Sequence, residues 1–475
     1  MAQPHILILG AGPAGLGAAF RLRRHGLARA SVLEQNRHVG GNAGSFDLAG
    51  MRVDFGSHRL HPACDPEILR DIRDLLGSDL LDRPRHGRIR LCGRWIHFPL
   101  KPMNLVLGLP MGFSFGVAAD LMRKVFGNDN GHEHVETFAS VLKFGLGRTI
   151  CDNFYFPYVQ KIWGLKPEEL AVTLARRRIS ANSLPKMTRK ILSALSGPSK
   201  SSRGRFYYPR HGYGQICEAY YSGARESGAE IHLNSQVQAV RIENSAVHVE
   251  YQDSEGRSRT LDADHVWSTI PITILAERLS PAPPEEILRA ARSIQYRAMI
   301  LVYIVLEQDR FSEFDAHYFP EVSLPISRLS EPKNYCDSAE PKNATVLCAE
   351  LPCSTEGSEW RKTADELGRL VGDSLEKAGI PLQARIMEIA VRRIRQAYPI
   401  YAKAYEAHFN PLDQWLGRID RLLTFGRQGL FAHDNTHHAL YMAYSAVKCL
   451  DESGGFDRER WQSFRGIFDS HVVED

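Results

Sequence analysis

The chain opens with a change in the period of its apolar positions. Residues 5–9, HILIL, form an unbroken apolar run typical of a parallel strand buried on both faces. Apolar residues then recur at helical spacing, at Leu16, Ala19, Phe20 and Leu22, before a stop at Gly26. A second apolar run, ASVLEQN, follows and reaches Glu34. The pattern predicts a strand, a helix and a second strand.

A glycine-rich turn, GAGPAG, occupies residues 10–15 between the first strand and the helix, and Glu34 lies 19 residues beyond its last glycine. This context predicts a dinucleotide site, because such glycines allow a tight turn, close approach to a pyrophosphate and close helix packing. An acid at the second strand accepts hydrogen bonds from a ribose and disfavours the 2′-phosphate of NADP. The residues expected to bind are Gly10, Gly12, Pro13, Ala14, Gly15 and Glu34.

A second glycine pair stands in VGGNAGSF, residues 39–46, just after the acid. An acid, a short spacer and Gly-Gly resemble the flavoprotein superfamily of amine oxidases, protoporphyrinogen oxidases, phytoene desaturases and UDP-galactopyranose mutases. In that family this loop runs beside the FAD pyrophosphate toward the flavin ring. The resemblance implies FAD as the cofactor and adds Gly40, Gly41 and Asn42 to its expected contacts.

The resemblance continues through the middle of the chain. DFGSH, residues 54–58, is similar to the family's DxGGH segment and implies that His58 lies beside the flavin and donates a hydrogen bond to it; a core histidine is the alternative. Residues 87–100 predict a hairpin. Residues 206–275 resemble the return of the chain to the FAD domain, with Val237 along the adenine.

Residues 318–335, YFPEVSLPISRLSEPKNY, resemble a segment of the UDP-galactopyranose mutases. The likeness implies that Arg328 holds a substrate diphosphate, with Arg178 of ARRRI as a second such arginine. Guanidinium groups suit phosphate geometry. The alternative for Arg328 is a salt bridge within a layer of strands.

The segment GRQGLFAHDNTHHALYMAYSAVKCL, residues 426–450, resembles the family's last FAD segment. It implies cofactor contacts at Gly426, Arg427 and Gly429, and His438 as a contact and proton donor near the flavin. Mutases carry Arg-Tyr where this chain has Ala432-His433, which argues against strict mutase activity. We expect no metal, because His433, His437 and His438 have no further ligand at a supporting spacing.

Composition limits the remaining function classes. Hydrophobic residues make up 43% and charged residues 24% of the 475-residue chain, as in a folded globular protein. The net charge, 59 − 55 = +4, does not indicate a nucleic-acid binder. The basic residues between 171 and 205, where no acid occurs, indicate either an attraction for an anionic substrate or membrane surface, or a solvated helix and loop.

Cysteine usage and the N-terminus indicate the compartment. The eight cysteines include no CxxC pair and are expected to be reduced, and no signal peptide is apparent, so we expect a cytoplasmic protein. Residues 105–122 form the most apolar window, interrupted by Pro110, three glycines and Asp120. We expect a buried or channel-lining helix there, with contact to a membrane surface as the lesser alternative.

The sequence therefore predicts an α/β fold with a Rossmann-like FAD domain of the glutathione-reductase type, built from residues 1–85, 206–275 and 425–475. Residues 86–205, mainly helical, and 276–424, with a mixed sheet, form an interleaved α+β substrate domain. The expected activity is transfer of hydride from a substrate C–H to flavin N5, on a small substrate that is anionic or phosphorylated. The alternatives are a mutase that uses reduced FAD as a nucleophile and a flavin-binding protein without catalysis; the oligomeric state stays open.

Overall fold

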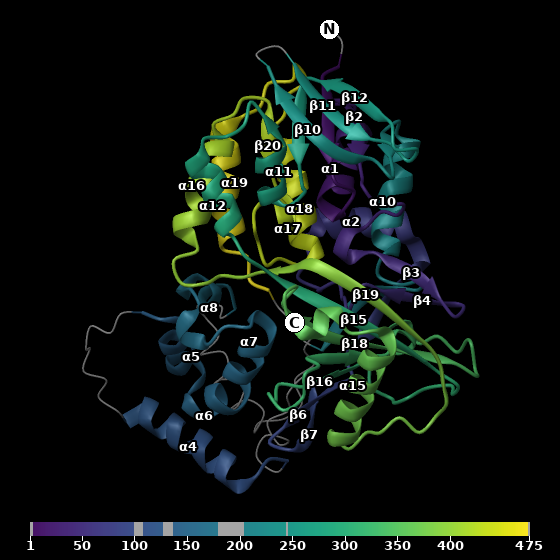
Figure 1. Ribbon diagram of the computed structural model, residues 1–475, viewed down its shortest axis with the longest axis vertical. Coiled ribbons are helices and arrows are strands. Elements are labelled where there is room, and N and C mark those ends of the chain that lie inside the picture. The colour runs from purple at the N-terminus through teal and green to yellow at the C-terminus, as the bar shows by residue number, and fades with distance from the viewer. Residues whose placement is uncertain (1–2, 99–107, 127–135, 179–203, 244–245, 474–475) are drawn as a thin grey trace.

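The computed structural model describes residues 3–98, 108–126, 136–178, 204–243 and 246–473. Two lobes are stacked along the longest axis of the molecule (Figure 1). The upper lobe contains the N-terminal strands and the C-terminal helices, and the lower lobe contains a mixed sheet and the helices of the chain's first third.

A parallel sheet of five strands forms the upper lobe, in the order β20 (Leu422–Thr424), β13 (His265–Ser268), β1 (His5–Leu9), β2 (Arg29–Leu33), β9 (Glu230–His232). The predicted first strand is confirmed, and four of its five residues are buried. Strands from three separated segments of the chain form the sheet, and the last of them, β20, lies within residues 276–424 rather than in the expected third segment 425–475.

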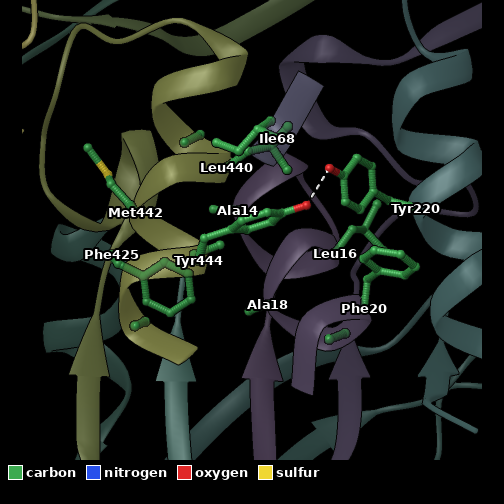
Figure 2. Close-up of a cluster of buried hydrophobic side chains, with 14 of the residues drawn as sticks. Ala14, Leu16, Ala18, Phe20, Ile68, Tyr220, Phe425, Leu440, Met442 and Tyr444 are labelled. Carbon is green, nitrogen blue, oxygen red and sulfur yellow. Dashed lines mark hydrogen bonds between the residues drawn. The ribbon is translucent and has the colours of Figure 1, made fainter. Parts of the chain in front are cut away.

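The helix predicted after β1 is confirmed as α1 (Pro13–Arg24). It packs between α18 (Thr436–Lys448) and α10 (Gln215–Glu226), and Figure 2 shows the apolar side chains that fill these contacts. Gly17 lets the helices approach, since a Cβ there would lie 2.7 Å from Leu440. The hydroxyls of Tyr220 and Tyr444 share a hydrogen bond of 2.7 Å across the cluster. Further helices of this lobe are α2 (Pro66–Leu76), α17 (Gly426–Gly429) and α19 (Arg458–Asp469).

A second sheet of four strands lies in the same lobe, in the order β12 (Ser258–Ala263), β11 (Val247–Gln252), β10 (Gln236–Ile242), β14 (Leu279–Ser280). Helices α11 (Ile272–Arg278), α12 (Glu285–Ser293) and α16 (Glu406–Gly417) lie in the same lobe. Two short pairs complete the lobe, β3 (Ser45–Leu48) with β4 (Met51–Asp54) and β5 (Leu80–Pro84) with β8 (Arg205–Pro209).

The lower lobe is built on a mixed sheet of seven strands, in the order β19 (Ile386–Pro399), β15 (Tyr296–Leu306), β18 (Thr345–Cys353), β17 (Arg328–Ser330), β16 (Ala316–Tyr318), β6 (Gly87–Leu91), β7 (Arg94–Phe98). The hairpin predicted at residues 87–100 is confirmed as β6 and β7. Strand β15 is buried over nine consecutive residues, which explains its unbroken apolar sequence. Helices of this part are α13 (Pro332–Cys336), α14 (Ser358–Arg361) and α15 (Ala364–Lys377).

The remaining helices of the lower lobe form an insert beside this sheet: α4 (Met111–Phe126), α5 (Phe138–Leu146), α6 (Arg148–Ile150), α7 (Phe156–Trp163) and α8 (Val172–Arg178). Lys161 of α7 fastens the insert to the sheet, because its ammonium donates to the carbonyls of Glu321 at 2.7 Å and Ile326 at 3.1 Å, and to that of Phe319. Burial lowers the pKa of Lys161 to about 7.

The expectation that the apolar window at 105–122 is buried is only partly correct for its described part, in which Leu109 and Phe113 are buried. Helix α4 leaves Met111, Phe115 and Met122 exposed to solvent. Within the described residues, none of the helices combines the length and the apolar character needed to cross a bilayer. All eight cysteines lie in the described part of the chain and are free, as expected.

A buried histidine predicts how stability depends on pH. His317 of β16 is 2% exposed, and its Nε2 accepts a hydrogen bond from Arg88 at 3.1 Å. Burial lowers the pKa of His317 to about 3, with a smaller contribution from Arg88. The unfolded chain takes up the proton near pH 6.5 and the folded chain does not, so stability falls as the pH falls below that value.

We expect replacement of His317 by Gln to remove about 2 kcal/mol of the stability lost between about pH 7 and about pH 5. Urea denaturation of both proteins at the two pH values measures the difference. His408→Gln, at an exposed histidine, is the matched control and should leave the pH dependence unchanged. An equal effect of the two substitutions would contradict the assignment of a neutral buried imidazole.

Candidate active site

A cleft of about 790 Å³ joins the two lobes. Its lining includes Gly12 and Glu34 from the parallel-sheet lobe, His58 from the segment after β4, and Arg328 from the mixed sheet. Tertiary folding thus brings most of the predicted site segments to one cavity. A cavity of this size suits a large ligand together with a small one.

The turn after β1 forms a cradle for an anion. Gly12 caps α1 in an extended conformation without a side-chain hydrogen bond, and a Cβ at Gly12 would meet no atom within 4 Å. The amides of the first turn of α1 are therefore open toward the cleft. Gly10 has a φ of +97°, and a Cβ at Gly15 would overlap the carbonyl of Gly10, so this turn requires both glycines.

Glu34 lies at the end of β2 and is 6% exposed. One of its oxygens accepts from the amide of Ala11 at 2.8 Å, and the other accepts from the amide of Asn36 at 2.9 Å and its side chain at 2.7 Å. A carboxylate has about four acceptor positions, so one is left for a ribose hydroxyl. The carboxylate is thus held in place before a ligand binds.

The second glycine pair rests on the first turn. The amide of Gly40 donates to the carbonyl of Ala11 at 2.8 Å, and a Cβ at Gly41 would lie 3.7 Å from the Cα of Gly12. Gly40 has a φ of +104°, which favours glycine. Gly41 and Asn42 line the cleft, whereas Gly40 supports the loop from behind. The two loops together expose glycine backbone along the same wall of the cleft.

His58 lines the cleft, with its ring stacked on Tyr213 at a centroid distance of 5.2 Å. Its Nε2 donates to the carbonyl of Phe55 at 3.0 Å, and burial lowers its pKa. The neutral ring therefore presents Nδ1 as an acceptor. The expected role as hydrogen-bond donor to a cofactor requires a second proton, which burial opposes.

Asp54 is buried and connects several segments of the chain, whereas the sequence indicated it only as part of the DFGSH motif. Its carboxylate accepts from the hydroxyls of Ser45 at 2.6 Å and Tyr208 at 2.5 Å and from the amide of Tyr213 at 2.8 Å. It joins β3, β4, β8 and the start of α10, and so holds the segment that carries His58.

Arg328 lies at the cleft but does not present a free guanidinium group. It forms a bidentate pair with Glu350 of β18, with Nε 3.0 Å and Nη2 2.9 Å from the two carboxylate oxygens. Glu350 also accepts from the amide of Ser57 at 2.8 Å. The strand-layer salt bridge considered for Arg328 is thus present. Glu350 was missed by sequence analysis, because its pairing partner lies 22 residues away on another strand.

The other predicted residues divide into a lining group and a supporting group. Pro13, Ala14 and Arg427 line the cleft, and Arg427 donates to the carbonyls of Ala397 at 2.7 Å and Asp434 at 3.3 Å. Gly426 and Gly429 are buried behind the lining, packed on Ala14 and Ser268. Val237 is half-buried and packs against an apolar core cluster, and its neighbour Gln236 lines the cleft instead. Arg178 ends α8, and its side chain lies outside the described part of the structure.

His438 lies at the first turn of α18 outside the cleft lining, stacked on His471 at 4.2 Å. Asp434 accepts from His471 at 3.0 Å and lies 3.9 Å from His438. The further ligand that sequence analysis failed to find for a histidine cluster is therefore His471, and these three residues could hold a metal by proximity. The ring planes of His438 and His471 differ by only 15°. The nitrogen lone pairs of the two rings therefore do not point at one ion unless one ring rotates.

Comparison with known proteins agrees with this geometry. The sequence model of the family described as flavin containing amine oxidoreductase matches residues 13–408. The structure is similar to a reduced UDP-galactopyranose mutase, with a TM-score of 0.77, 21% identity and coverage of 94% of each chain. It is also similar to a protein described as a protoporphyrinogen oxidase from Exiguobacterium sp. 255-15 (TM-score 0.72, 16% identity, 94% of this chain and 98% of that chain).

Cyclohexylamine oxidase from Brevibacterium oxydans IH-35A matches with a TM-score of 0.64, 16% identity and coverage of 94% of this chain and 98% of that chain. The predicted superfamily and α/β fold are confirmed. At these identities the structural likeness establishes a shared fold and no shared substrate.

The open space at Gly12 predicts a selective loss of cofactor. We expect Gly12→Val to fold with a melting temperature close to that of the apoprotein and to purify without flavin absorbance, since its side chain would fill the cradle. Gly466→Val is the matched control at an exposed helical glycine that also has no atom within 4 Å of an added Cβ. Full flavin content in folded Gly12→Val would contradict the assignment of this turn to the cofactor.

Proposed function

Because the chain belongs to the flavin-containing amine oxidoreductase family, we propose that it is an FAD-dependent oxidoreductase that removes hydride from a C–H bond of a small anionic substrate. One observation carries the proposal: a single cleft connects the glycine cradle and Glu34 to His58 and Arg328. A dinucleotide held at the cradle would lie in the same cleft as His58 and Arg328.

The residues present fit FAD. The amides at the start of α1 and the second glycine loop would hold the pyrophosphate, and Glu34 would hold the adenosine ribose. FAD, when bound, supplies a ring that accepts or returns hydride. The task of the protein is then to orient a substrate against that ring and to exclude water.

The cleft is cationic where the two lobes meet, which supports an anionic substrate. Arg393 and Arg395 of β19 line it; Arg393 donates to the carbonyls of Trp360 and Lys362, and Arg395 lies over the Trp360 ring. Among the described residues, neither arginine has a carboxylate within salt-bridge distance. A carboxylate or phosphate of a ligand would balance these charges.

The residues near His58 are suited to positioning a substrate. His58 is neutral at physiological pH, and the charge of Arg328 is balanced by Glu350. Hydride transfer requires no protein nucleophile, so orientation by these groups is sufficient for the proposed reaction. His58 Nδ1 remains available to accept a hydrogen bond from a substrate.

A nucleotide-sugar mutase is the second candidate, favoured by the position of Arg328 in the cleft. Two observations oppose it. Glu350 already engages two donors of Arg328, and Ala432, where mutases carry a phosphate-binding arginine, is 3% exposed. Without the second arginine, the described cleft has fewer groups to hold a diphosphate.

An anaerobic experiment distinguishes these activities. Oxidised and dithionite-reduced protein are each mixed with a panel of UDP- and dTDP-sugars, and flavin absorbance and sugar products are both followed. Bleaching of the oxidised flavin by one compound is expected and identifies the substrate. Isomerised sugar formed only by the reduced protein would replace the proposal with the mutase. A flavin that no substrate of a wider panel of amines, hydroxy acids and sugars reduces would indicate a non-catalytic flavin protein.

A matched set of variants tests Arg328. We expect Arg328→Met to raise the dissociation constant of the substrate identified by that panel by about tenfold or more, measured by titration of the flavin absorbance, because a charge-assisted hydrogen bond is lost. It should keep its flavin but lose stability, since Glu350 becomes a buried unpaired charge.

The double variant Arg328→Met, Glu350→Gln removes that unpaired charge while leaving Ser57 an acceptor. It should regain stability without regaining affinity. Recovery of affinity together with stability would assign Arg328 a purely structural role.

A further inference from the structure

Residues 319–326, in the connection between β16 and β17, close around one cation. The ammonium of Lys161, on the last turn of α7, donates to the carbonyls of Glu321 at 2.7 Å and Ile326 at 3.1 Å, and to that of Phe319. An ammonium group has three N–H donors, and each of them finds an acceptor in this loop. Carbonyls from both ends of the 319–326 loop therefore meet at a single side chain.

The closed form of the loop depends on this contact. Phe319 and Ile326 are completely buried, and among the described residues no other donor reaches either carbonyl. A buried carbonyl without a donor is costly. The flanking strands β16 and β17 contain three residues each, so their pairing alone gives the loop little support. The ammonium is therefore needed to keep the two ends of the loop together.

Lys161 is itself held in a fixed position. Arg297 of β15 donates to the carbonyl of Lys161 at 3.4 Å and to that of Pro352 on β18 at 3.3 Å. Gly164, just after α7, makes room for this contact, because a Cβ there would lie 2.6 Å from Nη1 of Arg297. The end of α7 is thus docked on β15 and β18, and the ammonium reaches the loop from there.

The 319–326 loop leads directly to the cleft. The amide of Ser327 donates to the carbonyl of Glu350 at 2.8 Å, and Arg328, the first residue of β17, forms its bidentate pair with the carboxylate of Glu350. That carboxylate also accepts from the amide of Ser57, which lines the cleft. A displaced loop would therefore move the pair of Arg328 and Glu350 and loosen the hydrogen bond of Ser57.

We propose that Lys161 is a positioning residue, whose ammonium closes the 319–326 loop against α7 and so fixes the place of Arg328 at the cleft. Lys161 is not among the residues that line the cleft, so it acts through the loop and not through contact with a ligand. The effect on substrate binding rests on the proposed function, whereas the effect on the loop and on Ser57 does not.

Hydrogen exchange of the full-length flavoprotein, followed by mass spectrometry, tests the proposal. Burial lowers the pKa of Lys161 to about 7, so the measurement is made at about pH 6, where the side chain is charged. Lys161→Met should speed exchange of the amides of residues 319–327 by about tenfold or more, because buried carbonyls lose their donor. The amide of Ser57 should also exchange faster, while residues 5–9 of the parallel sheet should not change.

Matched variants separate the charge from the bulk of the side chain. Lys161→Arg keeps a positive charge with several donors and should restore most of the protection. Lys342→Met, at an exposed lysine in the connection before β18, is the control and should exchange like the unmodified chain. Lys161→Gln, which keeps two donors and no charge, replaces Lys161→Met if that variant does not fold, with the same expected differences.

Two results would overturn the proposal. Equal exchange of residues 319–327 in Lys161→Met and the unmodified chain would show that the ammonium does not close the loop. A faster loop with an unchanged amide at Ser57 would leave Lys161 a structural contact without effect on the cleft.

Kinetics with the substrate identified by the anaerobic panel give a second measurement. Lys161→Met should raise KM by about tenfold and leave kcat within about twofold, because a displaced Arg328 weakens binding more than it alters hydride transfer. Lys161→Arg should give a smaller rise in KM. Faster exchange at both the loop and Ser57 with an unchanged KM would count against Arg328 as a substrate contact in the proposed function, while the positioning of Arg328 by Lys161 would stand.

Discussion

The whole architecture depends on one close approach, that of α1 to the turn after β1. No side chain fits between Gly15 and the carbonyl of Gly10, so the helix starts directly at the sheet and its amides open into the cleft. Gly17 likewise allows α1 to pack closely against α18. The helix axis is fixed by these contacts, and the positions of the second glycine loop and of Glu34 follow from it, because both bond to Ala11.

Buried carboxylates connect further segments of the molecule by hydrogen bonds. Glu34 organises the nucleotide end, Asp54 ties β4 to the returning chain, and Glu350 joins the mixed sheet to the segment of Ser57 and His58. Each accepts several hydrogen bonds, which offsets the cost of burying a charge. The cofactor end and the substrate end of the cleft are thus connected by hydrogen bonds rather than by apolar packing alone.

The same carboxylates limit what the cleft can do. Because Glu350 balances Arg328, the positive charge available to a ligand includes that of Arg393 and Arg395 on β19. Because His58 donates to Phe55, it faces a ligand as an acceptor. Both features suit a site that orients an anionic substrate beside a cofactor more than one that grips a diphosphate through several arginines.

The sequence by itself determined the parallel strand, the helix after it, the hairpin at residues 87–100 and the family, since these depend on local periodicity and on glycines needed at fixed short spacings. It also located most of the residues that line the cleft beside β1 and β2. Only the tertiary structure decided the partners of Arg328, the tautomer of His58, the meeting of His438 with His471 and the exposure of α4. Those outcomes depend on contacts between residues far apart in the chain, and a single sequence carries no local signal for such pairs.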